Sequence, residues 1–385
     1  MNRIPGKLPH LGGLTAGEFL NEYWQKKPLL IRQAFPALKE PFSAEEVLAL
    51  SGREDAESRL IVQNGTRWAL EHGPFTPRAL RKLHGQKWTV LVQDTQHFSA
   101  TAWRILQVFN FIPSARVDDL MVSHAVPGGG VGPHVDSYDV FLLQGTGKRR
   151  WQISAQRDQT LVPDAPLKLL ARFKPQQEWT LETGDMLYLP PGYAHNGIAE
   201  TTCLTWSIGF RAPTYQELAT AFLDFLRDEL TLQGQYGDPH LVATLRPGKI
   251  DAAMQHQFSR LLKQVRATTS QIDRFIGRYL TEPKPHVYFD PPSAPLNFRH
   301  FVSYAESKGL SLDLKTRLLY LKNSFFINGM EWPVAPADRA LFRLLADKRT
   351  IPATRLDPSA ARSLYENYLN GYLLTENQYG NNSRK

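Results

Sequence analysis

The 385-residue sequence predicts a mainly β fold of the antiparallel sandwich or jelly-roll type, with helices added to it. Two observations predict this class. Short apolar, β-branched segments follow one another between residues 119 and 210 without helical patterns between them. Glycine and proline clusters separate these segments, as turns do in antiparallel sheets. The length exceeds what one core usually supports, so two or three domains are expected.

The first hundred residues predict two helices and several strands. Residues 14–36 predict an amphipathic helix that begins at Thr15. A second helix is expected over residues 43–52, because Ser43 and Glu46 have the spacing of a capping box. Four short strands are expected beside these helices: Leu29–Ile31, Arg59–Gln63, Trp68–Glu71 and Trp88–Gln93.

The densest β region follows, and each expected strand in it ends at a turn signal. Its turns include Pro127-Gly128-Gly129-Gly130 and Pro190-Pro191-Gly192. The expected strands are Leu120–Val126, His134–Gln144, Arg150–Ser154, Glu178–Leu181, Met186–Leu189 and Thr202–Phe210.

Beyond residue 213 the apolar spacing becomes helical. Residues 214–232 and 251–280 form a helical middle segment, and the proline-rich stretch Pro283–Pro295 predicts a linker. The last part combines a helix, a hairpin and a helix, which fits a small winged-helix-like module. These elements are expected at Arg299–Lys308, at Arg317–Phe326 with Glu331–Val334 across Asn328-Gly329, and at Pro336–Asp347.

Composition limits the function classes. The single cysteine, Cys203, excludes an internal disulfide, a zinc finger and an iron–sulfur cluster. No apolar run is long enough to span a membrane and no signal-peptide pattern opens the sequence, so a cytoplasmic location is expected. The net charge of +8 fits either a nucleic-acid or ribosome-associated protein or solubility alone.

The strongest chemical signal is His134-Val135-Asp136 together with His195. Residues two apart on a strand project from the same face, so His134 and Asp136 can bind one metal ion. The His-x-Asp pair alone is a weak signal. It gains weight because a glycine-rich loop precedes it and a Pro-Pro-Gly turn delivers His195 some 60 residues later. In a double-stranded β-helix this histidine can lie beside the first pair.

Two imidazoles and one carboxylate form a facial triad that leaves positions open for oxygen and a bidentate 2-oxo acid, which suits Fe(II). Zinc is the competing metal for the same ligands. A 2-oxo acid also needs a cation for its distal carboxylate. Arg149 is the candidate, because it alternates to the same face as the apolar Trp151 and a guanidinium stays charged.

The sequence resembles the bacterial Jumonji-C ribosomal oxygenases, and within them most closely the arginyl hydroxylases of large-subunit ribosomal protein sixteen. The resemblance is dense over residues 14–213 and looser beyond. The motifs that carry it are Trp24-Gln25-Lys26-Lys27-Pro28, Asp118-Asp119-Leu120-Met121-Val122-Ser123, the segment from Pro127 to Phe141, Gln144–Trp151, Gly184-Asp185 with Pro190-Pro191-Gly192 and His195, and Ser207–Pro213.

This resemblance implies a cupin (Jumonji-C) catalytic domain over residues 1–212, a helical dimerisation segment over 213–282 and a winged-helix-like domain over 283–385. It implies His134, Asp136 and His195 as Fe(II) ligands, with 2-oxoglutarate and O2 as co-substrates. It also implies that Arg149 anchors 2-oxoglutarate and that Ser123 and Thr205 line the same pocket. The expected substrate is a large-subunit ribosomal protein, and the expected assembly is a homodimer.

An arginyl substrate carries a positive charge, so its pocket needs acidic and polar groups. The sequence offers five candidates near the motif: Asp118, Asp119, Tyr138, Asp139 and Ser207. Two other functions stay open. One is a metal-binding cupin regulator whose C-terminal domain binds DNA, although residues 281–385 hold only 14 Lys and Arg against 10 Asp and Glu. The other is an oxygenase of this class acting on a histidyl, asparaginyl or methyl-lysyl residue.

Overall fold

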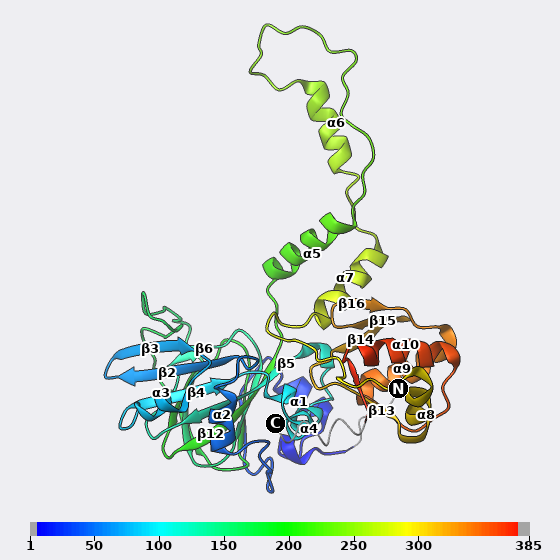
Figure 1. Ribbon diagram of the computed structural model, residues 1–385. Coiled ribbons are helices and arrows are strands. Elements are labelled where there is room, and N and C mark those ends of the chain that lie inside the picture. The colour runs from blue at the N-terminus through cyan, green and yellow to red at the C-terminus, as the bar shows by residue number, and fades with distance from the viewer. Residues whose placement is uncertain (1–5, 376–385) are drawn as a thin grey trace. The chain divides into compact units, whose positions relative to one another are not determined.

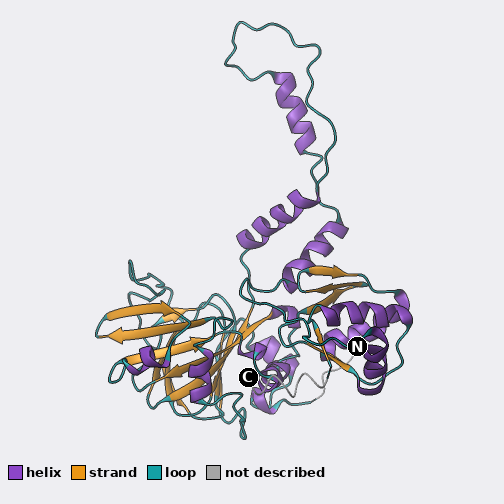
Figure 2. Cartoon of the chain, in the orientation of Figure 1, coloured by secondary structure: helices purple, strands orange, loops and turns teal. Residues whose placement is uncertain are grey.

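In the computed structural model, which describes residues 6–375, two antiparallel β-sheets form the framework of the first part of the chain (Figures 1 and 2). The larger sheet has the strand order β1-β10-β7-β12-β5-β4-β2-β3, and the smaller has the order β6-β11-β8-β9. The strands are β1 (Leu29–Ile31), β2 (Ser58–Asn64), β3 (Arg67–His72), β4 (Lys87–Val92), β5 (Val117–Ala125), β6 (His134–Val135), β7 (Val140–Gln144), β8 (Arg149–Ser154), β9 (Gln177–Leu181), β10 (Met186–Leu189), β11 (Ala194–Ala199) and β12 (Cys203–Phe210).

The predicted sandwich is confirmed, and β7 shows how it is held together. Alternate side chains of a strand point to opposite faces of its sheet. Phe141 and Leu143 therefore pack toward the helices that cover the large sheet, whereas Leu142 packs against Trp151 and Ile153 of the small sheet. The large sheet is thus buried on both faces here, and the space between the two sheets is the interior of a jelly roll.

Four helices of the first part accompany the sheets. The two predicted capping boxes are present: Thr15 pairs with Glu18 at the start of α1, and Ser43 pairs with Glu46 at the start of α2. The helix expected after Thr15 ends at Glu22, and the strand expected after it is present at Leu29–Ile31; between them Gln25, with a φ of 57°, has a left-handed backbone through which a helix does not continue. The four helices are α1 (Ala16–Glu22), α2 (Ala44–Leu50), α3 (Pro77–Arg81) and α4 (Ala100–Gln107).

Two strand predictions were wrong, and both concern the metal motif. The segment His134–Gln144 was expected as one strand but forms β6 in the small sheet and β7 in the large sheet, because the chain turns between the sheets at residues 136–139. The strand β11, which carries His195, was not expected at all. Asn196 and Gly197 are poor strand formers and hide it from a propensity argument.

A second compact unit comprises Pro213–Glu282 and Arg317–Ala346, whereas Pro283–Thr316 and the described residues from 347 onward group with the first part. Its helices are α5 (Tyr215–Glu229), α6 (Ala252–Leu262) and α7 (Thr269–Thr281). Its sheet consists of β14 (Leu318–Leu321), β15 (Ser324–Ile327) and β16 (Met330–Trp332). The expected turn at Asn328-Gly329 joins β15 to β16, but Arg317–Phe326 holds two strands rather than one.

The remaining C-terminal elements are α8 (Phe298–Lys308), β13 (Leu310–Leu312), α9 (Arg339–Lys348), β17 (Thr350–Ile351), α10 (Pro358–Leu369) and β18 (Leu373–Leu374). The helix α10 was not expected from the sequence. Among residues 6–375, no helix is both long and apolar enough to cross a membrane. The division of the chain at residues 212 and 282 stays a prediction.

Candidate metal centre and adjoining pockets

The two histidines of the motif lie on neighbouring strands of the small sheet. His134 of β6 is the register partner of His195 of β11, so both side chains leave the sheet on one face. Their ring centroids are 4.1 Å apart. Asp136 follows β6 directly and places Oδ1 3.9 Å from Nε2 of His134 and Oδ2 3.5 Å from Nε2 of His195. One potential ligand atom from each residue lies within 4.8 Å of the other two, so the cluster can hold one metal ion.

Backbone carbonyls orient both imidazoles. Nδ1 of His134 lies 2.9 Å from the carbonyl oxygen of Gly132, and Nδ1 of His195 lies 3.0 Å from that of Tyr193. A carbonyl only accepts, so each Nδ1 carries the proton and each Nε2 presents a lone pair to the cluster. Burial, and secondarily the charge of a protonated His134, lower the pKa of His195 to about 4. The buried ligand is therefore neutral at pH 7, as metal binding requires.

The glycine-rich loop before His134 lies tightly against β11. A Cβ atom on Gly130 would collide with the carbonyl oxygen of Gly197, and the backbone N–H of Gly128 donates a 2.7 Å hydrogen bond to the carbonyl of Ala199. Only glycine permits this approach of one backbone to another. The loop thereby fixes where His134 enters the site relative to His195.

Arg149 of β8 is buried between the two sheets, with only 4% of its surface exposed. Its Nη1 donates a 3.2 Å hydrogen bond to Ser123 of β5, whose register partner on β12 is Thr205. Within the described part of the chain, Nε and Nη2 have no hydrogen-bond partner. A buried cation with two free donors is costly unless a ligand pairs with it. A carboxylate of a 2-oxo acid has the charge and the two oxygens that this group lacks.

Gln144 is a residue of this pocket that the sequence reasoning missed. It is fully buried at the end of β7, and its Oε1 accepts a 3.2 Å hydrogen bond from the hydroxyl of Thr205. Its Nε2 donates to the carbonyl of Leu204 at 3.0 Å. The sequence did contain a signal for Gln144: a polar amide directly follows the apolar run Val140–Leu143. A buried strand tolerates an amide only where its hydrogen bonds are satisfied, so the amide indicates polar partners at this position.

Asp119 and Tyr138 both lie next to Gly209, and Tyr138 is close enough to Asp136 of the metal cluster to be affected by its charge. A Cβ atom on Gly209 would be 3.3 Å from Oδ1 of Asp119 and 3.7 Å from the ring of Tyr138, so the missing side chain leaves room between them. Burial, followed by the negative charge of Asp136, Asp119 and the neighbouring Asp118, raises the pKa of Tyr138. We call Asp118, Asp119 and Tyr138, with the bare backbone of Gly209, the acidic pocket.

The charge of the acidic pocket depends on pH near neutrality. Asp119 is 6% exposed, and burial, partly opposed by Lys284, raises the pKa of its carboxyl to about 7. The neighbouring charges of Asp94 and Asp118 raise the pKa further. Ser207 is buried on β12 beside Met121 of β5, in the same inward row as Thr205. It therefore faces the space between the sheets.

Asp139 does not belong to the pocket, although the sequence placed it there. Its side chain is fully buried, and its carboxylate accepts hydrogen bonds from Tyr188 at 2.7 Å, Gln25 at 3.0 Å and Arg116 at 3.3 Å. These partners lie on the helix-covered side of the large sheet, where Tyr188 packs against Phe19. A carboxylate occupied in this way is a structural group, and these hydrogen bonds leave it unavailable for the substrate contact that the sequence predicted.

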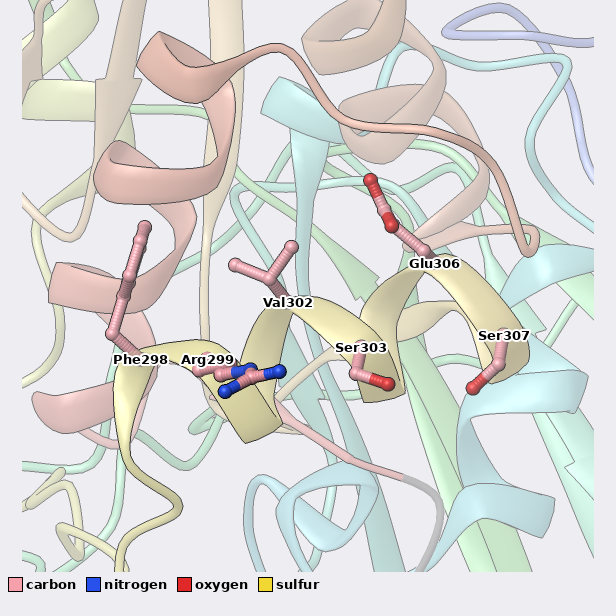
Figure 3. Close-up of a pocket in the computed structure, with 6 residues that line it drawn as sticks. All are labelled: Phe298, Arg299, Val302, Ser303, Glu306 and Ser307. Carbon is pink, nitrogen blue, oxygen red and sulfur yellow. The ribbon is translucent and has the colours of Figure 1, made fainter.

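A shallow hollow of about 680 Å³ lies along α8 (Figure 3). Figure 3 shows the six residues of α8 that line it: Phe298, Arg299, Val302, Ser303, Glu306 and Ser307. None of these residues belongs to the metal cluster, the Arg149 pocket or the acidic pocket. The hollow is therefore separate from the candidate site, whose groups converge between two sheets rather than on a helix surface.

Comparison with protein families agrees with this geometry. A model of the JmjC domain matches residues 104–218, and a model of the ROXA-like winged helix matches residues 260–374. The ribosomal protein uL16 3-hydroxylase of Escherichia coli (strain K12) is 31% identical over 279 residues, which cover 72% of this chain and 74% of that protein. The chain belongs to the JmjC ribosomal oxygenases.

Other members of the JmjC ribosomal oxygenases support the assignment. A probable ribosomal oxygenase of Haemophilus influenzae is 38% identical over 210 residues, about half of each chain (53% of this one and 52% of that one). The X-ray structure of E. coli YcfD has a TM-score of 0.82 at 29% identity and covers 94% of this chain and 98% of its own. Another structure, of YcfD in complex with cobalt and 2-oxoglutarate, has a TM-score of 0.80 at 28% identity, with the same coverage. The present chain is accordingly a 2-oxoglutarate-dependent dioxygenase.

Proposed function

We propose that this JmjC ribosomal oxygenase hydroxylates an arginine side chain of ribosomal protein uL16 in the cytoplasm, using Fe(II), 2-oxoglutarate and O2. The observation that carries the proposal is the acidic pocket beside the three-residue metal cluster. A pair of carboxylates with an aromatic ring is the environment that attracts a guanidinium group. The E. coli relative is a uL16 3-hydroxylase by name, which supports the choice of protein.

His134, Asp136 and His195 would hold the iron. Bound iron supplies, with 2-oxoglutarate and O2, the oxidising power to insert one oxygen atom into a C–H bond. Arg149 would bind the distal carboxylate of 2-oxoglutarate through its free Nε and Nη2 donors. Ser123 and Thr205 border the same space, and Ser123 fixes the guanidinium by accepting its Nη1 bond.

The acidic pocket would hold the substrate arginine beside the metal. Asp119 would accept hydrogen bonds from the guanidinium, Asp118 would add negative charge nearby, and the ring of Tyr138 would lie against the guanidinium plane. Ser207 would add a hydroxyl on the inward face of β12. This charge favours a cationic side chain over a histidyl or asparaginyl residue, and the same site would attract methyl-lysine.

The proposal includes a homodimer formed through the helical middle segment. Large apolar side chains are exposed on α6 and α7, where an isolated chain would leave them in water. They are Phe258, Leu261, Leu262, Ile272 and Ile276. The molar mass in solution, measured by light scattering, would be twice the chain mass if the proposal holds and equal to it if the proposal fails.

The direct test is an intact-mass assay with purified uL16. The protein is loaded with Fe(II) without oxygen and then given O2 and 2-oxoglutarate. We expect uL16 to gain one oxygen atom, mapped to an arginine by fragmentation, and to gain nothing when 2-oxoglutarate is omitted. Variants H134A and D136A serve as controls that lack a metal ligand and should leave uL16 unchanged. Oxygen found on a histidine, or loss of a methylene mass from lysine, would overturn the arginine assignment.

A further inference from the structure

Lys284 brings a positive charge from a distant part of the sequence to the acidic pocket. It stands at the start of the proline-rich stretch that follows α7, a segment that the sequence predicts as a linker. Its Nζ lies 3.1 Å from each carboxylate oxygen of Asp94 and 3.4 Å from Oδ1 of Asp118. The side chain of Lys284 is about three-quarters buried, so these contacts are less screened by water than those of an exposed lysine.

Asp94 connects this contact to the backbone of β5. Its side chain is buried, and Oδ1 also accepts a 3.1 Å hydrogen bond from Nε2 of Gln96. Oε1 of Gln96 in turn accepts a 2.9 Å hydrogen bond from the backbone N–H of Leu120, the residue next to Asp119. The backbone N–H of Asp94 itself lies 3.5 Å from Oδ2 of Asp119. Lys284 therefore contacts Asp118 of β5 directly and reaches the backbone of the same strand at Leu120 through Asp94 and Gln96.

The charges around Asp119 are unbalanced without Lys284. Asp94 and Asp118 both disfavour the ionised form of Asp119, and Lys284 is the group that opposes them most strongly. Burial would lower the pKa of Lys284, yet the charges of Asp119, Asp94 and Asp118 raise it, so Lys284 keeps its proton. The other charged or titratable groups near this cluster are Glu57, Arg59, His97, Asp136, Tyr138 and His286.

Lys284 does not occupy the place of a substrate cation. Its Nζ contacts Asp94 and Asp118, whereas the open side of Asp119 faces Gly209 and Tyr138. The contacts of Lys284 thus lie away from the side of Asp119 that faces Gly209 and Tyr138, which is where the proposed function places the substrate guanidinium.

We propose that Lys284 is a positioning residue for the substrate: its ammonium group fixes the carboxylates of Asp94 and Asp118 around the acidic pocket and places a positive charge near Asp119. This inference rests on the proposed arginyl hydroxylation, because it assigns Lys284 to the recognition of that cationic side chain. If Lys284 only stabilised the fold, its replacement would affect thermal stability alone. As a positioning residue, it also affects substrate binding and the dependence of that binding on pH.

The test compares the full-length wild-type chain with variants K284A and K284R. Binding of purified uL16 is measured by calorimetry under nitrogen, and KM and kcat are measured between pH 6 and 8.5. For K284A we expect Kd and KM to rise about fivefold at pH 7, because a rise of one unit in the pKa of Asp119 from about 7 lowers its ionised fraction from one half to about one tenth. We expect kcat to change less than about twofold. The difference should shrink at pH 8.5, where Asp119 ionises without help. K284R should restore most of the affinity.

The matched control is K322A, which breaks a 2.6 Å ion pair with Asp273 in the second unit and should bind uL16 as the wild type does. A K284A variant with unchanged affinity and pH profile would overturn the inference. So would tighter binding, or a loss of thermal stability with equal losses at every pH. A wild type that binds uL16 without hydroxylating arginine would instead overturn the proposed function, while the K284A affinity would still decide the role of Lys284.

Discussion

Replacing Arg149 by methionine should weaken 2-oxoglutarate binding and at the same time stabilise the free protein. The two effects have one cause. Without ligand, Arg149 is a buried cation with two unpaired donors, and burial lowers the pKa of its guanidinium despite the opposing contact with Cys203. Methionine has a similar length and needs no hydrogen bonds. R149M therefore removes a group that is costly in the free protein and needed in the complex.

The magnitudes follow from the two free donors, Nε and Nη2. A hydrogen bond to a charged group contributes about 1.5–3 kcal/mol. Losing two of them should raise the Kd of 2-oxoglutarate ~100-fold or more. In the free protein, replacing a buried ionic group by an apolar group of similar volume either leaves the free energy of unfolding unchanged or raises it by ~1–4 kcal/mol. The melting temperature of the ligand-free protein should accordingly rise by about 2 °C or more.

The assay pairs calorimetry of 2-oxoglutarate, with Fe(II) under nitrogen, with thermal melting of the ligand-free protein. The control is R150M, one position along β8, where the guanidinium is exposed and pairs with Glu178 and Glu200. R150M should leave both measurements close to the wild type. An R149M variant that binds 2-oxoglutarate within about threefold of the wild type would refute the assignment of the anchor. A lower melting temperature in R149M alone would mean that the cation serves the fold.

Two further predictions concern the carboxylates. The KM for uL16 should rise about tenfold per pH unit below 7 and stay level above it, because Asp119, with a pKa of about 7, gains a proton and loses its charge as pH falls. The variant D119N should have a KM that does not depend on pH in this range. A D119N profile with the wild-type slope would assign the titration to another group. D139N should lower the free energy of unfolding, measured in urea, by about 1–3 kcal/mol, because Tyr188 and Arg116 lose their charged hydrogen-bond acceptor. The KM for uL16 should stay the same. A raised KM with normal stability would show that Asp139 contacts the substrate.

The sequence predicted the parts of the fold that depend on local signals. The capping boxes at Thr15 and Ser43 involve residues three apart, and their helices begin where expected. The jelly roll followed from short strands and turn residues. The strand β11 was not predicted because its residues have low strand propensity; it is a strand only because it pairs with β6 and β8. A pairing of this kind has no signature within the segment itself.

The same distinction separates the site residues that sequence could find from those it could not. His134 and Asp136 share a strand-like spacing, and their glycine-rich loop adds a second local signal. Lys284 lies 190 positions from Asp94, in a stretch whose prolines indicate only a linker. No property of either residue points to the other. Long-range ion pairs become visible only when the fold brings them together.

Tyr138 and Asp139 show that the roles of neighbouring residues in a motif cannot be inferred until the position of each residue relative to the two sheets is known. The chain passes from the small sheet to the large one at these two positions. The ring of Tyr138 reaches the acidic pocket beside Gly209, whereas the carboxylate of Asp139 is buried against Tyr188 on the helix-covered side. Under the proposed function, residues one apart thus serve substrate binding and folding respectively. The same crossing begins at Asp136, whose carboxylate lies 3.5 Å from Nε2 of His195, so four consecutive positions hold a candidate metal ligand, a candidate substrate contact and a structural carboxylate.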